Sequence, residues 1–275
     1  MDKATREAAA ETIEEGFYRI LARIGDERQL RKRREQLHNV WLQLTLPGLD
    51  LLDSLTGPIK IGLGTVFEDL ALVLARHQFD RVLPQYEVKG YLNPQTLLLI
   101  DDILADYKDR VRKPDTEAEK AALLAAQNPR APEAIEDEQR VDLYLQRGEH
   151  VWLVEMKSSG KHDTTASAAL KRKMLRAFAL HNRPHTDIIL GCAFNPYGEG
   201  AEFRWMPIRR TFEYGKELLV GRPFWNLLGQ SETTYEELKE VWAAIGPTVE
   251  RQAVDIINRA LACLTDTRLR LKLEE

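Results

Sequence analysis

The chain has 275 residues, 44% of them hydrophobic, which is enough to bury a substantial core and argues against a disordered protein. Its 39 basic and 43 acidic residues give a net charge of −4, so there is no global basic field, although a local basic surface would still suffice for a nucleic-acid partner. The two cysteines, Cys192 and Cys263, exclude a disulfide framework and a four-cysteine zinc site. Because no segment resembles a signal peptide or a membrane span, we expect a soluble, cytoplasmic protein.

The chain opens with helical patterns. Apolar residues recur at helical spacing over residues 4–24, and a second such pattern runs over residues 27–44. Glycines and prolines in residues 47–64 predict a break, and a third helix follows over residues 65–77, with its first threonine as the N-cap. We therefore predict an N-terminal helical layer over residues 1–60.

The next part is punctuated by proline and glycine. A short strand is predicted at residues 86–89, followed by a helix over residues 97–107. Residues 113–139 are charged, rich in alanine and carry three prolines. That composition predicts an exposed insertion containing one short helix.

The most regular segment begins at residue 140. Two apolar runs, residues 141–145 and 151–157, have strand composition and are joined by a glycine-containing turn, which is the signature of a hairpin. A basic helix over residues 166–181 and an apolar strand over residues 188–194 follow, and a further strand is predicted at residues 201–208. The order strand, strand, helix, strand implies a mixed sheet with a crossover helix.

The predicted fold is therefore of the α/β (α+β) class, with a mixed central β-sheet flanked by helices and with helical additions at both ends. We predict a single domain over residues 1–275, with a core at 61–210 and a C-terminal helical part at 211–275. Helices at roughly residues 234–244 and 248–264 are expected in that last part.

Two carboxylates are expected to meet on the hairpin. Asp142 lies in its first strand and Glu155 near the end of the second, and strand alternation places Glu155 and Lys157 on the same face. Carboxylate oxygens are the ligands of hard Mg²⁺, which offsets phosphate charge and lowers the pKa of an attacking water, and Lys157 can hold that water. The backbone carbonyl of Met156 is near enough to be a further metal ligand. The pattern predicts a site for phosphodiester hydrolysis.

The spacing of Asp142, twelve intervening residues and then Glu155 and Lys157 resembles the PD-(D/E)XK nuclease superfamily, and the whole-chain layout looks most like a type II restriction endonuclease. The resemblance implies Mg²⁺-dependent cleavage of double-stranded DNA by a homodimer, with the acidic residues as metal ligands. A glutamate on a preceding helix often completes the family's site, a role that would fall to Glu68. Val141 stands where the motif's name has proline, but that proline performs no chemistry.

Other interpretations stay open. The tripeptide Glu-x-Lys also occurs at Glu87-Val88-Lys89 and, in a predicted helix, at Glu237, where side chains two residues apart diverge by about 200°. The residues of the hairpin would alternatively form an ordinary solvated face. A repair or junction-resolving nuclease and a non-catalytic DNA-binding module on the same fold are the rival functions. Because no Gly-rich phosphate loop is present, no nucleotide cofactor is expected.

DNA contacts are expected just after the predicted catalytic strand, where a polar loop leads into the basic helix. A solvated helix face is an equal alternative for any single residue there, and the asparagine after the last apolar strand marks a turn first and a recognition loop second. The predicted DNA-binding residues are Lys161, His162, Lys171, Arg172 and Asn195.

Overall fold

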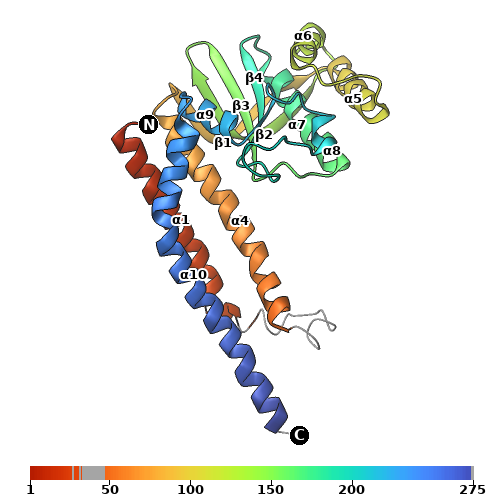
Figure 1. The fold of residues 1–275 in the computed structure, drawn as a ribbon. Coiled ribbons are helices and arrows are strands. Elements are labelled where there is room, and N and C mark those ends of the chain that lie inside the picture. Colours follow the sequence, from red (N-terminus) through yellow and green to blue (C-terminus); the bar gives the residue numbers. More distant parts are fainter. Residues whose placement is uncertain (27, 31, 33–46, 274–275) are drawn as a thin grey trace. The chain divides into compact units, whose positions relative to one another are not determined.

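The computed structural model describes residues 1–26, 28–30, 32 and 47–273. The chain divides into two compact units, shown in Figure 1. The sheet unit comprises Met1 and Ala71–Glu236, and the helical unit comprises Asp2–Leu70 and Glu237–Glu275. These boundaries differ from those expected at residues 60 and 210, and one nuclease domain over the whole chain stays a prediction.

The sheet unit contains β1 (Arg81–Leu92), β2 (Ile135–Arg147), β3 (His150–Lys157), β4 (Thr186–Cys192) and β5 (Leu218–Val220). They form one five-stranded sheet in the order β1-β2-β3-β4-β5. The pairs β1–β2 and β2–β3 are antiparallel, whereas β3–β4 and β4–β5 are parallel. Parallel neighbours require a crossover, which the helix α7 (Thr164–His181) supplies between β3 and β4. The predicted mixed sheet with flanking helices is confirmed.

Helix α7 covers one face of the sheet, packing on β1, β2, β3 and β4. Its N-terminus is fixed by Asp163, whose side chain accepts a hydrogen bond from the N–H of Ala166 at 2.7 Å, and it ends at Asn182 in the left-handed conformation. Beside it lie α5 (Pro94–Asp109) and α6 (Thr116–Ala126), while α8 (Met206–Arg209) and α9 (Arg222–Gly229) come later in the chain.

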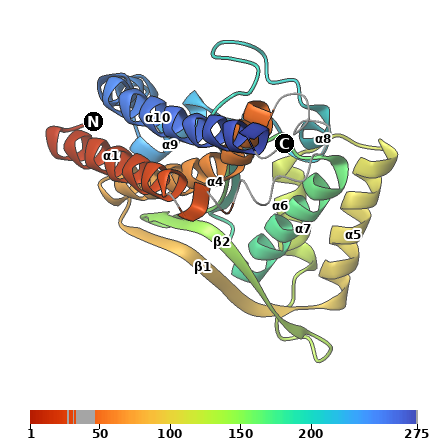
Figure 2. The same ribbon diagram turned by 90° about the horizontal axis from the view of Figure 1, so that it is seen from below.

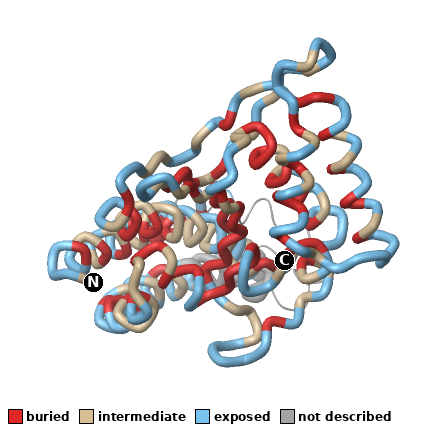
Figure 3. Tube along the Cα trace, turned by 90° about the horizontal axis from the view of Figure 1, so that it is seen from above, coloured by how far each residue is buried: buried red, intermediate tan, exposed pale blue. Residues whose placement is uncertain are grey.

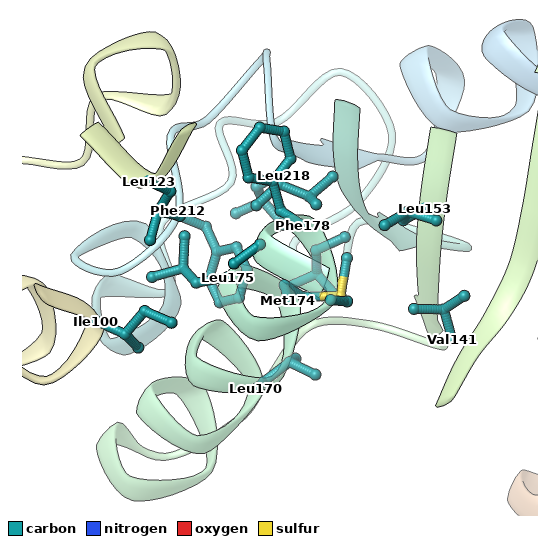
Figure 4. Close-up of a cluster of buried hydrophobic side chains, with 14 of the residues drawn as sticks. Ile100, Leu123, Val141, Leu153, Leu170, Met174, Leu175, Phe178, Phe212 and Leu218 are labelled. Carbon is teal, nitrogen blue, oxygen red and sulfur yellow. The ribbon is translucent and has the colours of Figure 1, made fainter. Parts of the chain in front are cut away.

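The apolar core of this unit lies between α7 and its neighbours (Figure 4). Leu170, Met174, Leu175 and Phe178 are buried residues of α7 that are labelled in that view. Burying each such side chain contributes about 1.5–3 kcal/mol, so this one helix anchors the sheet. The residues that it meets come from α5, α6 and the strands: Ile100, Leu123, Val141, Leu153 and Leu218.

The helical unit contains α1 (Lys3–Gly25) with most of α4 (Pro47–Arg76) and of α10 (Thr234–Leu273), which lie side by side in Figures 1 and 2. Glycines let α1 and α4 approach closely. A Cβ added at Gly16 would lie 2.4 Å from Val66 Cγ2, and one added at Gly62 would lie 2.4 Å from Ile20 Cγ1. Tertiary packing therefore outweighs the weak helix propensity of glycine at these positions.

Two of the expected helix boundaries are wrong. The break expected over residues 47–64, with Thr65 as an N-cap, does not exist, because α4 continues through Pro58 and Gly62. Likewise α10 runs on through Pro247, where two helices were predicted. The helix predicted over residues 27–44 falls largely outside the described residues.

Two expectations for the sheet unit are also corrected. Residues 113–139 are not simply an exposed insertion, because α6 buries Glu119, Lys120 and Leu123, and the first half of β2 pairs with β1. The strand predicted at residues 201–208 is absent, and α8 begins there at Met206. The strand β5 was missed because three residues are too few to show an alternating pattern.

Burial follows the elements closely. Figure 3 shows buried positions recurring along helices and strands, with exposed stretches in the connections between them. Within the part of the chain that the structure describes, we find no helix with both the length and the apolar character needed to cross a membrane.

Candidate active site

Asp142 and Glu155 meet on the β2–β3 hairpin. Leu143 pairs with Val154, so the two acidic residues take the next position on neighbouring strands. The backbone N–H of Met156 donates a hydrogen bond to Asp142 Oδ2 at 2.7 Å, which ties the first carboxylate to the second strand. The hairpin thus brings together the two acidic residues that its spacing singled out.

Glu155 is the buried centre of this site, with only 4% of its surface exposed. Lys157 Nζ lies 2.8 Å from its Oε1, and Lys173 Nζ, on α7, lies 2.5 Å from its Oε2. A carboxylate out of water is costly unless it is paired, so an ammonium on each oxygen both compensates and positions Glu155. Lys173 was not singled out from the sequence, because its helix carries several basic residues with no sign of which one turns toward the hairpin.

The electrostatics around Asp142 favour a cation. Burial raises the pKa of Asp142, and the neighbouring charge of Glu155 raises it further. The N–H of Met156 and the two ammonium groups, of Lys157 and Lys173, lower it only in part. A divalent cation between the two carboxylates would offset their mutual repulsion, so the donor chemistry fits a hard ion such as Mg²⁺.

The donor set is small. Among the described residues no group of three or more His, Cys, Asp or Glu side chains gathers into a metal-binding cluster. Asp142 and Glu155 would therefore act with a backbone oxygen, for which the Met156 carbonyl is the prediction, and with water, which Mg²⁺ usually retains. Glu68 lies on α4 within the helical unit, and its part in the site stays a prediction.

Gln85 on β1 is a neighbour of the site that sequence reasoning missed. Its φ of 48° lies in the left-handed region, which is uncommon for a residue with a side chain. The residues flanking it pair with those on either side of Asp142, and its Nε2 lies 3.4 Å from Asp142 Oδ1. Nothing in the sequence marks a glutamine for such a conformation, although backbone outliers do cluster at functional sites.

The loop between β3 and α7 carries two of the predicted DNA-binding residues. Lys161 Nζ lies 5.2 Å from the centre of the Tyr197 ring. Burial lowers the pKa of His162, and the charge of Lys157 lowers it further, so its imidazole is neutral at pH 7. The loop thus carries one cation, Lys161, and one neutral ring, His162, which lies near enough to Lys157 to feel its charge. Their contact with DNA stays a prediction.

Asn195 and Arg172 are engaged within the fold. Asn195 Nδ2 donates to the carbonyl of Ala201 at 2.7 Å, and its Oδ1 accepts the N–H of Tyr197 at 3.1 Å, which is a turn-forming role. Arg172 pairs with Asp101 on α5 and keeps 46% of its side chain exposed. Their contacts with DNA also remain predictions.

Lys171 requires a correction. Its side chain has no exposed surface, and its Nζ lies 2.6 Å from Glu119 Oε2 and 2.5 Å from Glu217 Oε2. The Tyr107 hydroxyl donates to the other oxygen of Glu119. An ammonium enclosed by two carboxylates cannot reach a phosphate, so the prediction that Lys171 contacts DNA is wrong. A run of basic residues does not reveal which of them a helix turns inward.

The competing motif, Glu87-Val88-Lys89, lies on β1 and has a surface character. The Glu87 side chain is 50% exposed and lies 2.7 Å from Lys89 Nζ, which also lies 3.4 Å from Glu138 across the strand pair. Such exposed pairs contribute little and need no catalytic explanation. The buried carboxylate with two lysines is the stronger candidate for the active site.

Known proteins resemble this chain over most of its length. The family model of the HinfI type II restriction endonucleases matches residues 7–246. The type II restriction enzyme HgiCII of Herpetosiphon aurantiacus is 24% identical over 195 residues, which cover 68% of this chain and 70% of the relative. HgiBI, a type II restriction enzyme of the same organism, is 24% identical over 192 residues, covering 68% of this chain and 69% of the relative. Enzymes of this class hydrolyse double-stranded DNA, generally with a divalent metal ion. The chain belongs to the HinfI family of type II restriction endonucleases.

Proposed function

We propose that this protein is a Mg²⁺-dependent endonuclease that cuts double-stranded DNA at a short specific site, with Asp142, Glu155 and Lys157 as its catalytic residues. The observation that carries the proposal is the placement of two carboxylates side by side on a hairpin, with Lys157 on the buried one. We also propose that it acts as a homodimer in the cytoplasm and that both units belong to one nuclease domain. A two-fold symmetric site in DNA is naturally read by a two-fold symmetric protein.

The residues divide the work of hydrolysis. Mg²⁺, when bound, supplies a Lewis acid and lowers the pKa of water. Asp142 and Glu155 would hold it, with the Met156 carbonyl and Glu68 as further proposed donors. Lys157 would orient the attacking water and hold its position, and its 2.8 Å contact with Glu155 supports this role.

Around that centre, the proposed DNA contacts are Lys161, His162, Arg172 and Asn195. The first two follow the end of β3 directly, where a phosphate near the reacting one would lie. Backbone contacts of this kind fix the register of the DNA, whereas the recognised bases are read elsewhere in the grooves.

Metal dependence is the first prediction. Purified protein with bacteriophage DNA and MgCl₂ should give discrete bands on a gel, and EDTA should abolish them. Lys157→Ala should reduce the rate by about a hundredfold, because a group positioned for water activation typically contributes that much. A smear in place of bands would point to a repair-type nuclease, and intact DNA under all conditions would contradict the proposal.

Lys173 gives a second prediction. Its ammonium lies 2.5 Å from Glu155 Oε2, on an oxygen that a metal ion would also seek. Lys173→Gln should therefore strengthen Mn²⁺ binding by about tenfold, because it removes a positive charge that repels the metal ion at Glu155 Oε2. Titration calorimetry without DNA measures this. Lys216→Gln, which removes a surface lysine paired with Glu213, should leave the Mn²⁺ affinity unchanged. Equal affinities in wild type and Lys173→Gln would show that Lys173 does not compete with the metal.

A further inference from the structure

A polar cavity of about 450 Å³ lies on the β1–β2 pair beside the end of α7. The proposed active site does not use it. Residues from β1, from β2 and from the end of α7 line it, among them Arg81, Tyr86, Tyr144, Gln146, His181 and Arg183. Its lining contains no Asp or Glu. A half-open polar pocket whose lining contains cations and no carboxylate is suited to an anion.

Two cationic side chains of the cavity are available to bind an anion. Arg81 and Arg183 are exposed, and neither forms an ion pair with any carboxylate among the described residues. The third cation, Lys89, is already shared between Glu87 at 2.7 Å and Glu138 at 3.4 Å. The two guanidinium groups therefore supply the charge of the cavity.

Aromatic rings line the cavity beside Arg81. The rings of Tyr86 and Tyr144 lie 4.7 Å apart, and the Arg81 guanidinium lies 5.7 Å from the Tyr144 ring centre. Burial and the charge of Arg183 lower the pKa of His181 to about 4, so its imidazole is neutral at pH 7. Burial raises the pKa of Tyr144, which keeps its hydroxyl protonated. His181 and Tyr144 are therefore uncharged, and neither repels an incoming anion.

The cavity lies in line with the active site. Side chains alternate along a strand, so Asp142, Tyr144 and Gln146 share one face of β2, each about 7 Å from the next. Charges on one DNA strand follow each other at about 3.4 Å of helix rise, so a strand reacting at Asp142 has further phosphates within reach of Tyr144 and beyond.

We propose that Arg81 and Arg183 bind a backbone phosphate of the cut DNA strand, a few nucleotides from the scissile phosphate. The proposal rests on the proposed function, since it takes DNA as the source of the phosphate. Guanidinium groups suit it because they bind phosphate through two parallel N–H bonds. The contact sets the position of the strand and carries no base specificity.

The structural alternative is that Arg183 serves only the fold, because it follows the carboxyl end of α7, where a cation is stabilised by the helix dipole. In that case its replacement would lower the thermal stability and leave DNA affinity alone. The two readings therefore differ in a measurable way.

The test is binding of a fluorescent 30-base-pair duplex in EDTA, over a series of NaCl concentrations, followed by anisotropy. Arg81→Gln/Arg183→Gln should bind at least about tenfold more weakly, and the slope of log K against log[NaCl] should fall by about 1.8, which corresponds to two lost phosphate contacts. Arg110→Gln/Arg130→Gln removes two exposed arginines outside the cavity and should bind like the wild type. Unfolding temperatures should match in all three proteins.

An unchanged slope in the cavity variant, or a loss of DNA affinity equal to that of the control variant, would overturn the proposed phosphate site. So would a lowered unfolding temperature with unchanged affinity. Because no metal is present, the result is independent of cleavage. If the wild type cuts no DNA with Mg²⁺ but the slope still falls in the cavity variant, the proposed function fails and the phosphate site stands. A wild type that binds no duplex at any salt concentration overturns both.

Discussion

Glu155→Gln is expected to lower the rate of DNA cleavage by about a thousandfold or more. The change keeps the size of a buried side chain but removes the negative charge that both lysines and the proposed metal ion require. Loss of a metal ligand removes several kcal/mol of transition-state stabilisation, and each 1.36 kcal/mol corresponds to about a factor of ten. Single-turnover cleavage of plasmid DNA with MgCl₂ measures the effect.

The matched control is Glu87→Gln, which alters the other strand-borne Glu-x-Lys motif of the sheet. Glu87 is exposed and pairs with Lys89 on the surface, so cleavage should proceed at the wild-type rate. Circular dichroism should show both variants folded. The side chains of Lys157 and Lys173 are each 30% exposed, so water can solvate their ammonium groups when Glu155 loses its charge. Activity that survives Glu155→Gln and disappears in Glu87→Gln would move the active site to β1.

Lys171→Met is expected to destabilise the protein by about 3–5 kcal/mol, the usual cost of leaving a buried charge without its partner. The ammonium lies between Glu119 and Glu217, and all three side chains are 0–1% exposed. Without it, two carboxylates would face each other in the core. Thermal unfolding measures the loss, and Arg172→Met, at the adjacent exposed position, should change the unfolding temperature little.

The pH dependence of this destabilisation follows from Glu217. Burial raises the pKa of Glu217 from 4.5 to about 7, with the charge of Lys171 opposing the shift. The folded state thus binds this proton more tightly than the unfolded chain, so the stability that Glu217 contributes is greatest below pH 4.5 and is lost as the pH rises through about 7. In Lys171→Met the opposing charge is gone, and the loss of stability should be larger at pH 8 than at pH 5.5. A loss independent of pH would show that cavity formation, not charge, destabilises the variant.

The hairpin that carries Asp142 and Glu155 was predictable because it depends on neighbouring residues. Two apolar strands joined by a short turn must pair, and alternation then fixes which side chains share a face. The same local logic correctly placed α7 as the crossover between β3 and β4.

What the sequence did not reveal depends on contacts between distant elements. Lys173 reaches Glu155 only because of the angle at which α7 turns on the sheet, and Lys171 is buried because Glu119 and Glu217, far apart in the chain, meet it. Gln85 is distinguished by its left-handed backbone conformation, which no residue pattern encodes. Helix propensity failed at Gly62 for the same reason, since a close approach of two helices decided the outcome.

The basic residues of α7 make its length intolerant of change. Lys171, Arg172 and Lys173 point in different directions around the helix, and Arg176 lies one turn after Arg172. The four meet acidic residues of α6, α5, β3 and β2, respectively. Inserting one residue just before Lys171 would rotate all four by about 100° and separate every pair at once. An insertion in the exposed connection over residues 128–133 would disturb none of them. Deletions and duplications in descendants of this enzyme should therefore accumulate in that connection and spare the helix.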